Sequence, residues 1–113
     1  MICPTCQTEG SVTTLARLMV DSDGRSREYR AWLRCQKCRA CYYGTSEEYF
    51  FDDDFIFSLY AAETAGWERS LERALKCPHA QDDECACAAH KTPAEGVGKL
   101  LRYTPTFYPK GDS

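Results

Sequence analysis

The chain has 113 residues, of which 43% are hydrophobic and 27% charged, and its formal net charge is -3 at pH 7. A chain of this length makes one small domain, or one domain with an appendage, and it buries roughly two thirds of its unfolded surface. No apolar run approaches the ~20 residues of a membrane-spanning helix, so we expect a soluble protein. The net charge by itself neither favours nor excludes a nucleic-acid partner.

Eight cysteines in so short a chain indicate that disulfides or metal ions supplement the core. The cysteines lie in short Cys-x-x-Cys and Cys-x-Cys groups mixed with histidine, and neighbours so close can hardly pair with one another in disulfides. Residues 1–4 also lack the basic and apolar regions of a secretory signal. We therefore favour zinc in a reducing, cytoplasmic compartment over a disulfide framework.

The first predicted zinc site combines two Cys-x-x-Cys pairs, Cys3/Cys6 and Cys35/Cys38. Two such pairs supply the four thiolates of a tetrahedral zinc site. A fifth thiol leaves an alternative in which Cys38 and Cys41 complete the site. We favour Cys35/Cys38 because Cys35 ends a predicted strand, where a knuckle should begin, and Cys41 is then a small buried side chain.

The opening Cys3-Pro4-Thr5-Cys6 resembles that of the zinc-ribbon superfamily. The resemblance extends over residues 1–45 and implies a knuckle, an antiparallel hairpin and a second knuckle around one zinc ion. The chain departs from the pattern at Gln7 and Arg39, where ribbons often have glycine. Zinc ribbons are frequent in transcription and RNA machinery, so the resemblance makes nucleic-acid binding one candidate function by analogy.

The hairpin implied by this resemblance is visible in the residue pattern. Residues 12–20 and 28–34 alternate in the manner of strands, and Asp21–Gly24 between them has turn chemistry. In the second strand Trp32 and its charged neighbours face away from Tyr29 and Leu33. We expect a third strand near residues 39–44.

The next segment, residues 42–60, is rich in aromatic and acidic residues. An extended piece is expected around residues 49–51, and residues 55–60 fit a strand or the start of a helix. We expect the rings to fill the core, because aromatic side chains bury much area. An exposed aromatic binding surface is the alternative.

Residues 64–76 have the spacing of an amphipathic helix, with Trp67, Leu71, Ala74 and Leu75 on one face. Pro78 prevents the helix from continuing and makes the preceding residue extended. We expect the helix to pack on the ribbon and to deliver Cys77 to a second zinc site.

The second predicted site uses Cys77, Cys85, Cys87 and His90, with His79 as an alternate ligand. These ligands lie so close in sequence that their loop has little chance of holding its shape without the ion. A catalytic zinc needs an open coordination position and a nearby acid or base, for which Asp83 and Glu84 are candidates. The deaminase and His-Glu-x-x-His signatures are absent from the sequence, so we expect both zinc ions to be structural.

These elements predict a small zinc-stabilised α+β protein, with a zinc-ribbon antiparallel hairpin or sheet, one amphipathic helix and a second zinc-binding loop. The expected divisions are a zinc ribbon at 1–50, an aromatic segment, helix and second zinc loop packed on it at 51–91, and an extended tail at 92–113. Within the tail, residues 104–109 are proline-rich and are expected to be extended or polyproline-like.

A basic, aromatic stretch at residues 25–39 is the candidate binding surface. Cations and interleaved rings can neutralise phosphates and stack on unpaired bases, although cations here also balance an anionic zinc-thiolate cluster. The residues we expect to bind are Arg25, Arg27, Arg30, Trp32 and Arg34. The acidic net charge and the acidic patch at 47–54 favour a protein partner.

We therefore expect a non-catalytic regulatory or adaptor protein that binds another macromolecule. A nucleic-acid-binding zinc ribbon is the alternative. A zinc or thiol-redox enzyme is less favoured, because the thioredoxin-like βαβ pattern is absent from the sequence.

Overall fold

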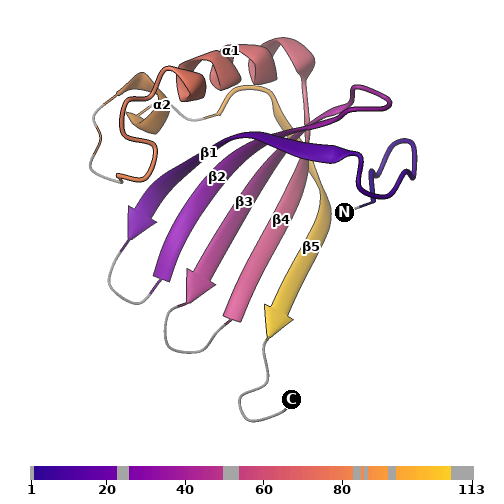
Figure 1. Cartoon of the computed structure of the whole chain (residues 1–113), viewed down its shortest axis with the longest axis horizontal. Coiled ribbons are helices and arrows are strands. Elements are labelled where there is room, and N and C mark those ends of the chain that lie inside the picture. Colours follow the sequence, from indigo (N-terminus) through magenta and orange to yellow (C-terminus); the bar gives the residue numbers. More distant parts are fainter. Residues whose placement is uncertain are drawn as a thin grey trace.

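The computed structural model describes residues 2–22, 26–49, 54–82, 85, 87–91 and 94–107, and at 54, 55, 88, 91 and 104–107 it describes the backbone alone. The elements in chain order are β1 (Val12–Ser22), β2 (Ser26–Cys35), β3 (Cys41–Tyr49), β4 (Asp54–Ala62), α1 (Thr64–Leu75), α2 (Ala88–Lys91) and β5 (Val97–Phe107). The strands form one antiparallel sheet in the order β1-β2-β3-β4-β5, so each strand lies beside its neighbours in the chain (Figure 1).

The predicted hairpin is present as β1 and β2, which pair from Val12 opposite Cys35 to Ser22 opposite Arg27. Residues 23 and 24 of the predicted turn lie outside the described residues. The third predicted strand is β3, and the ambiguous segment at 55–60 belongs to strand β4. The part of the aromatic segment at 50–53 also lies outside the described residues.

Both faces of the sheet are buried over part of their area. On the face toward α1, Trp32 lies opposite Tyr43, and these side chains are 1% and 2% exposed. On the other face, Leu33 lies opposite Tyr42, and both are again buried. The sequence alternation therefore does not separate a buried face from a solvated one, because each face has its own core.

Helix α1 confirms the predicted amphipathic helix. It begins after Glu63, whose carboxylate accepts hydrogen bonds from the first-turn N–H groups of Ala65 and Gly66. Trp67 is fully buried, and its Nε1 donates to the carbonyl of Tyr42 at 2.9 Å, which fastens the helix to β3. Leu75 was expected on the buried face but is 63% exposed, because the helix ends there and the chain turns away.

The largest departure from the sequence prediction is β5. Residues 97–107 belong to the predicted extended tail at 92–113, and they pair with β4 from Val97 opposite Ala62 to Phe107 opposite Asp54. Pro105 is tolerated there because β5 is an edge strand, where one side of the backbone donates no ladder hydrogen bond. With β5, the sheet has five strands and is larger than the predicted hairpin.

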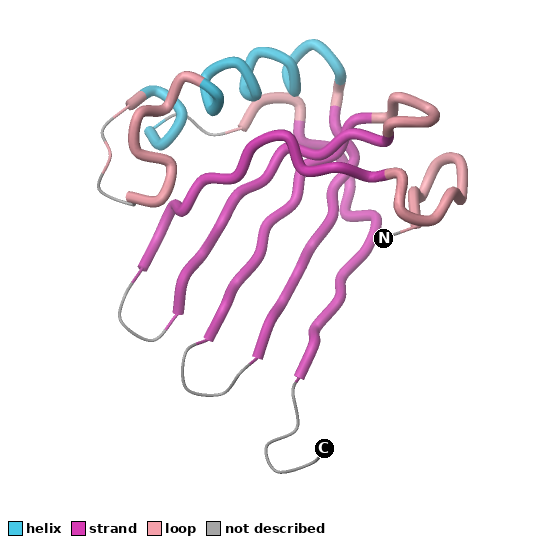
Figure 2. The backbone as a smooth tube through the Cα atoms, in the orientation of Figure 1, coloured by secondary structure: helices cyan, strands magenta, loops and turns pink. Residues whose placement is uncertain are grey.

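The helices lie over one end of the sheet, and the strands extend beyond them at the other end (Figures 1 and 2). The N-terminal loop and the β2–β3 connection lie at the helix-covered end (Figure 2). Within the described residues, no helix has the length and apolar character needed to cross a membrane.

Candidate metal centres

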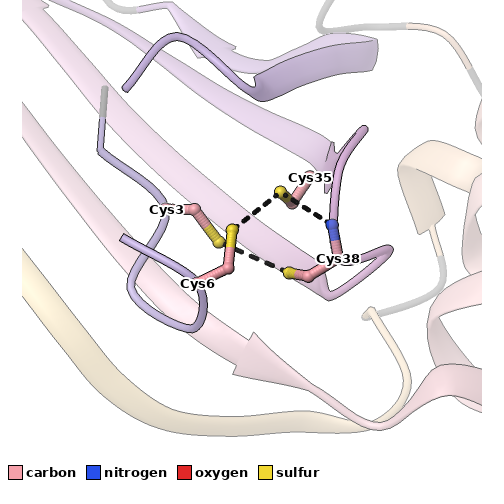
Figure 3. Close-up of side chains that lie close together, drawn as sticks. All are labelled: Cys3, Cys6, Cys35 and Cys38. Carbon is pink, nitrogen blue, oxygen red and sulfur yellow. Dashed lines mark hydrogen bonds between the residues drawn. The ribbon is translucent and has the colours of Figure 1, made fainter. Parts of the chain in front are cut away.

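The first cysteine cluster forms where the start of β1 meets the end of β2. Cys3 and Cys6 lie in the loop before β1, whereas Cys35 ends β2 and Cys38 lies in the turn that follows. Because Val12 pairs with Cys35, the two loops are brought together at the same end of the hairpin. Figure 3 shows the four side chains pointing toward one another.

The two loops have the same backbone hydrogen-bond pattern. The N–H of Gln7 donates to the carbonyl of Cys3, and the N–H of Arg39 donates to the carbonyl of Cys35, each at 2.9 Å. Gln7 and Arg39 have φ of 60° and 67°, in the left-handed region that favours glycine. Two residues with a β-carbon therefore adopt the left-handed conformation at equivalent positions of the two loops.

The sulfur atoms of this cluster lie at metal-site spacing. The Sγ–Sγ distance is 3.7 Å between Cys3 and Cys38 and 3.6 Å between Cys6 and Cys35 (Figure 3). Four sulfurs each ~2.3 Å from a zinc ion form a tetrahedron whose edges are about 3.8 Å. A disulfide requires about 2.05 Å, and all eight cysteines are free thiols in this structure. The four residues can hold one metal ion.

Hydrogen bonds around this cluster favour thiolate at Cys35. The N–H of Cys38 lies 3.4 Å from the Cys35 sulfur, and together with the Ser11 hydroxyl it lowers the pKa of Cys35 to about 5. For Cys38 itself, the N–H of Ala40 lowers the pKa, but burial and the neighbouring thiols raise it to about 12. The thiolate is therefore favoured at Cys35 and disfavoured at Cys38.

A tyrosine supports the cluster from the sheet. The hydroxyl of Tyr42 lies 3.2 Å from the Cys3 sulfur and 2.6 Å from the Thr5 hydroxyl oxygen. Burial, followed by the Cys3 contact, raises the pKa of Tyr42 to about 12, so this hydroxyl remains a donor at neutral pH. No spacing rule in the sequence identified Tyr42, because its contact with Cys3 depends on the packing of β3.

Cys41 lies outside the first cluster. It is 8% exposed, begins β3 on the face toward α1, and packs in the core with Trp32 and Trp67. Its sulfur accepts from Nη2 of Arg34 at 3.3 Å. The structure therefore places Cys35, rather than Cys41, beside Cys38 and the N-terminal pair.

The second cluster brings together Cys77, Cys85, Cys87 and His90. The Sγ atoms of Cys77 and Cys85 are 3.8 Å apart, and His90 Nδ1 lies 3.5 Å from Cys77 Sγ and 3.2 Å from Cys87 Sγ. Tetrahedral zinc with sulfur at ~2.3 Å and nitrogen at ~2.05 Å predicts about 3.6 Å between sulfur and nitrogen. These residues can also hold one metal ion.

Contacts with β1 fix this second cluster on the sheet. The short helix α2 carries His90, whose Nε2 lies 3.1 Å from the carbonyl oxygen of Met19. The N–H of Met19 donates to the carbonyl of Ala80 at 2.8 Å. A carbonyl acceptor at Nε2 leaves Nδ1 free to bind a metal, a common arrangement for histidine ligands.

The remaining predicted members of the second site lie elsewhere. His79 is exposed and is not part of the group that can hold a metal ion. Asp83 and Glu84, the candidate acid or base residues, lie outside the described residues. Contact with His90 lowers the pKa of Cys87 to about 6, and burial raises that of Cys77 to about 11.

The predicted binding residues do not form one surface. Trp32 is 1% exposed in the core, so the prediction that it contacts a partner is wrong. The guanidinium of Arg34 lies 4.6 Å from the Trp67 ring centroid and bonds Cys41, which gives it a packing role. Arg27 is exposed and Arg30 is half-buried, whereas Arg25 lies outside the described residues.

No family model, curated protein or solved structure matches the chain.

Proposed function

We propose that this protein is a non-catalytic binding module stabilised by two structural zinc ions, and that its partner is another protein. The observation that carries the proposal is the pair of clusters, each with four ligand atoms within 4.8 Å of one another. Four protein ligands complete a tetrahedral zinc site, whereas a catalytic zinc keeps one position for water or substrate. The proposed role of each ion is therefore to hold the fold.

Zinc is the proposed metal because of the donor atoms. Four thiolates in one site, and three thiolates with one imidazole in the other, are typical ligand sets of structural zinc. The thiols are free, which agrees with the reducing, cytoplasmic location that we propose. Bound at the first cluster, zinc would tie the start of β1 to the end of β2. At the second cluster it would order residues 77–90 against the edge of β1.

A protein partner is favoured by the distribution of charge and apolar surface. Arg17 pairs with Glu48 at 3.0 Å and its guanidinium lies 3.7 Å from the Tyr29 ring centroid, so this cation is compensated on the surface. On the edge strand β5, Val97, Leu100 and Tyr103 are 48%, 49% and 56% exposed. Exposed apolar side chains beside mixed charges are more typical of a protein interface than of a phosphate-binding surface.

Nucleic-acid binding is the second candidate. The observation that favours it is that Lys37 and Arg39 in the second knuckle are exposed, as is Arg27 on β2. These cations could contact phosphates even though Trp32 and Arg34 are packed inside the protein.

Native mass spectrometry tests the metal proposal directly. We expect two zinc ions per chain with all eight cysteines reduced, and we expect chelation to abolish the near-UV circular dichroism signal. A metal-free chain with disulfides, or a fold that survives complete metal removal, would contradict the proposal.

Binding of the zinc-loaded protein to single- and double-stranded nucleic acid across a salt series tests the choice of partner. Affinity that falls steeply with salt and decreases in Arg39→Glu would make nucleic acid the partner. A lack of binding at low salt would support the protein-partner proposal. Lys99→Glu on β5, at an exposed residue far from the knuckles in sequence, serves as a control for nonspecific charge effects.

A further inference from the structure

Part of the helix-side sheet face remains open beyond α1. Leu100 lies opposite Tyr60 and Tyr103 lies opposite Ser58. Because β5 has register shifts against β4, its exposed residues Val97, Leu100 and Tyr103 recur every third position yet share the face that carries Tyr43 and Tyr60. This arrangement creates a strip of apolar surface beside the uncovered part of the face.

A cavity of about 360 Å³ lies in this open part of the face. Its lining comes from strands β2, β3 and β4 and from the segment that enters β5, and the lining residues are Arg30, Tyr43, Thr45, Tyr60, Ala94 and Val97. The volume is within the range of about 300–1,000 Å³ for small-molecule sites. As in such sites, most of the lining is aromatic or aliphatic and the polar groups are few.

Among the described residues that line the cavity, Arg30 is the only one with a charged side chain. It lies opposite Thr45 in the sheet, and both side chains are half-buried. Burial lowers the pKa of Arg30, while nearby Glu28 acts in the opposite direction. An arginine guanidinium nonetheless stays protonated at neutral pH, so the cavity contains a partly desolvated positive charge beside a hydroxyl.

The aromatic residues provide the apolar part of the cavity. The hydroxyl of Tyr43 donates to the carbonyl of Glu95, and its ring also packs edge-on against Trp32. This tyrosine is therefore fixed in place, with its hydroxyl already paired. Tyr60 and Val97 add apolar area on the side toward β5.

The charge around Arg30 selects among anions. Glu28 lies opposite Glu47 in the neighbouring row of the same sheet face. These carboxylates repel any anion, and they repel a phosphate monoester, which carries about -1.5 to -2 at neutral pH, more strongly than a singly charged ligand. A carboxylate carries a single charge and accepts two parallel hydrogen bonds from an arginine.

We infer that this cavity binds a carboxylate attached to a small apolar or aromatic body. The carboxylate contacts Arg30 and Thr45, and the apolar body lies against Tyr43, Tyr60 and Val97. The same chemistry is found in a free organic acid and in the C-terminal residue of a peptide. This site goes beyond the proposed two-zinc fold, and its test does not depend on which metal the clusters bind.

The experiment is an NMR titration of the metal-loaded protein with phenylacetate and with its neutral analogue phenylacetamide. We expect saturable shifts at the amides of residues 30, 45, 60 and 97, and binding of phenylacetate that is about tenfold or more tighter than that of phenylacetamide. Equal affinity for the two probes, absence of saturable binding, or shifts confined to the knuckle cations would overturn the inference.

Matched variants identify the residues responsible. Arg30→Gln is expected to weaken phenylacetate binding by about tenfold or more, whereas Arg27→Gln, on the same strand but the opposite face, should leave it unchanged. Val97→Trp should weaken both probes by filling the cavity. An unaltered phenylacetate affinity in Arg30→Gln and Val97→Trp would refute the site. Metal content and the amide spectrum without ligand report whether each variant is folded.

A tetrapeptide that ends in phenylalanine distinguishes the two sources of the carboxylate. Tighter binding of its free-acid form than of phenylacetate, with loss on C-terminal amidation, would assign the cavity to a peptide terminus. Binding of phenylacetate without any gain for the peptide would assign it to a free acid. If neither phenylacetate nor the free-acid peptide binds, the inference is rejected. The zinc proposal is tested separately, because native mass spectrometry counts the metal ions whether or not the cavity binds an acid.

Discussion

Gln7 and Arg39 occupy equivalent backbone positions in the two halves of the first cysteine cluster. Each directly follows the second cysteine of a Cys-x-x-Cys loop, donates its N–H to the carbonyl of the first cysteine, and has a positive φ. The left-handed conformation costs a residue with a β-carbon roughly 1–2 kcal/mol. The cluster therefore contains the same local strain twice.

Replacement of either residue by glycine should relieve this strain. We expect Gln7→Gly and Arg39→Gly each to raise the free energy of unfolding by about 0.5–1 kcal/mol. This gain is smaller than the relieved strain, because the greater freedom of glycine in the unfolded chain opposes it. Denaturant titration of the zinc-loaded protein measures the change. Thr8→Gly, next to Gln7 but without a positive φ, is the matched control and should be destabilising. A loss of stability in both knuckle variants would contradict the strain argument.

The contrast between Cys35 and Cys41 can be tested by metal counting. Cys35→Ser should weaken metal binding at the first cluster more than about 100-fold, so that one zinc ion is lost. Cys41→Ala should retain two ions, because its sulfur lies in the core beside Arg34. Native mass spectrometry of the two variants gives the count. Two ions in Cys35→Ser and one in Cys41→Ala would indicate that the Cys38/Cys41 pair forms the site.

Tyr42 should strengthen zinc binding at the first cluster although it is not a ligand. Tyr42→Phe removes the hydroxyl 3.2 Å from the Cys3 sulfur and should weaken zinc binding there by about 10-fold. Competition with a chromophoric chelator measures the affinity of each site. The second cluster acts as an internal control, and Tyr103→Phe on β5 as an external one. An equal loss at both sites would show a general loss of stability instead.

Glu95 should make stability depend on pH. Its carboxylate lies 2.8 Å from Arg73, and this contact, followed by Arg69, holds the pKa of Glu95 below its ordinary value. A lowered pKa in the folded state stabilises the fold above the unfolded pKa of about 4.5, and the contribution is lost as pH falls through the folded pKa.

Glu95→Gln should therefore be less stable than the parent at pH 7, with a difference that shrinks toward acid pH. The effect should be modest because the side chain is 38% exposed. Urea titrations at several pH values measure the difference in the free energy of unfolding between the two proteins. When both proteins lose metal over the same pH range, acid-driven metal release affects them equally and does not change this difference. A difference that is constant with pH would refute this account.

Gly66 permits the chain entering β5 to pass close to α1. A β-carbon at this position would lie 2.8 Å from the carbonyl carbon and 2.9 Å from the carbonyl oxygen of Glu95. Gly66→Ala should thus destabilise the protein by about 1–3 kcal/mol, although alanine in a helix normally stabilises by about 1 kcal/mol. Thermal unfolding measures whether the substitution lowers or raises the melting temperature. Gly98→Ala, whose β-carbon meets Ala61 at 3.1 Å or more, is the milder control, and a stabilising Gly66→Ala would exclude the clash.

Features that depend on short spacing along the chain can be predicted from the sequence. Cys3 and Cys6 are neighbours in any compact turn, and Cys85 and Cys87 likewise lie close together whatever the rest of the chain does. The helical period around Trp67 and the alternation on both sides of residues 21–24 likewise predicted α1, β1 and β2. In each of these cases the information lies within a few residues.

The remaining features depend on contacts between distant segments, which the sequence pattern does not predict. The pairing of Val12 with Cys35 selects Cys35 over Cys41, and the packing of α1 removes Trp32 from the surface. The tail became β5 because β4 offered an unpaired edge, whose backbone groups need hydrogen-bond partners. Residues as far apart as Arg30 and Val97 line one cavity for the same reason: sheet order and register fix which distant side chains meet, and no local spacing carries that information.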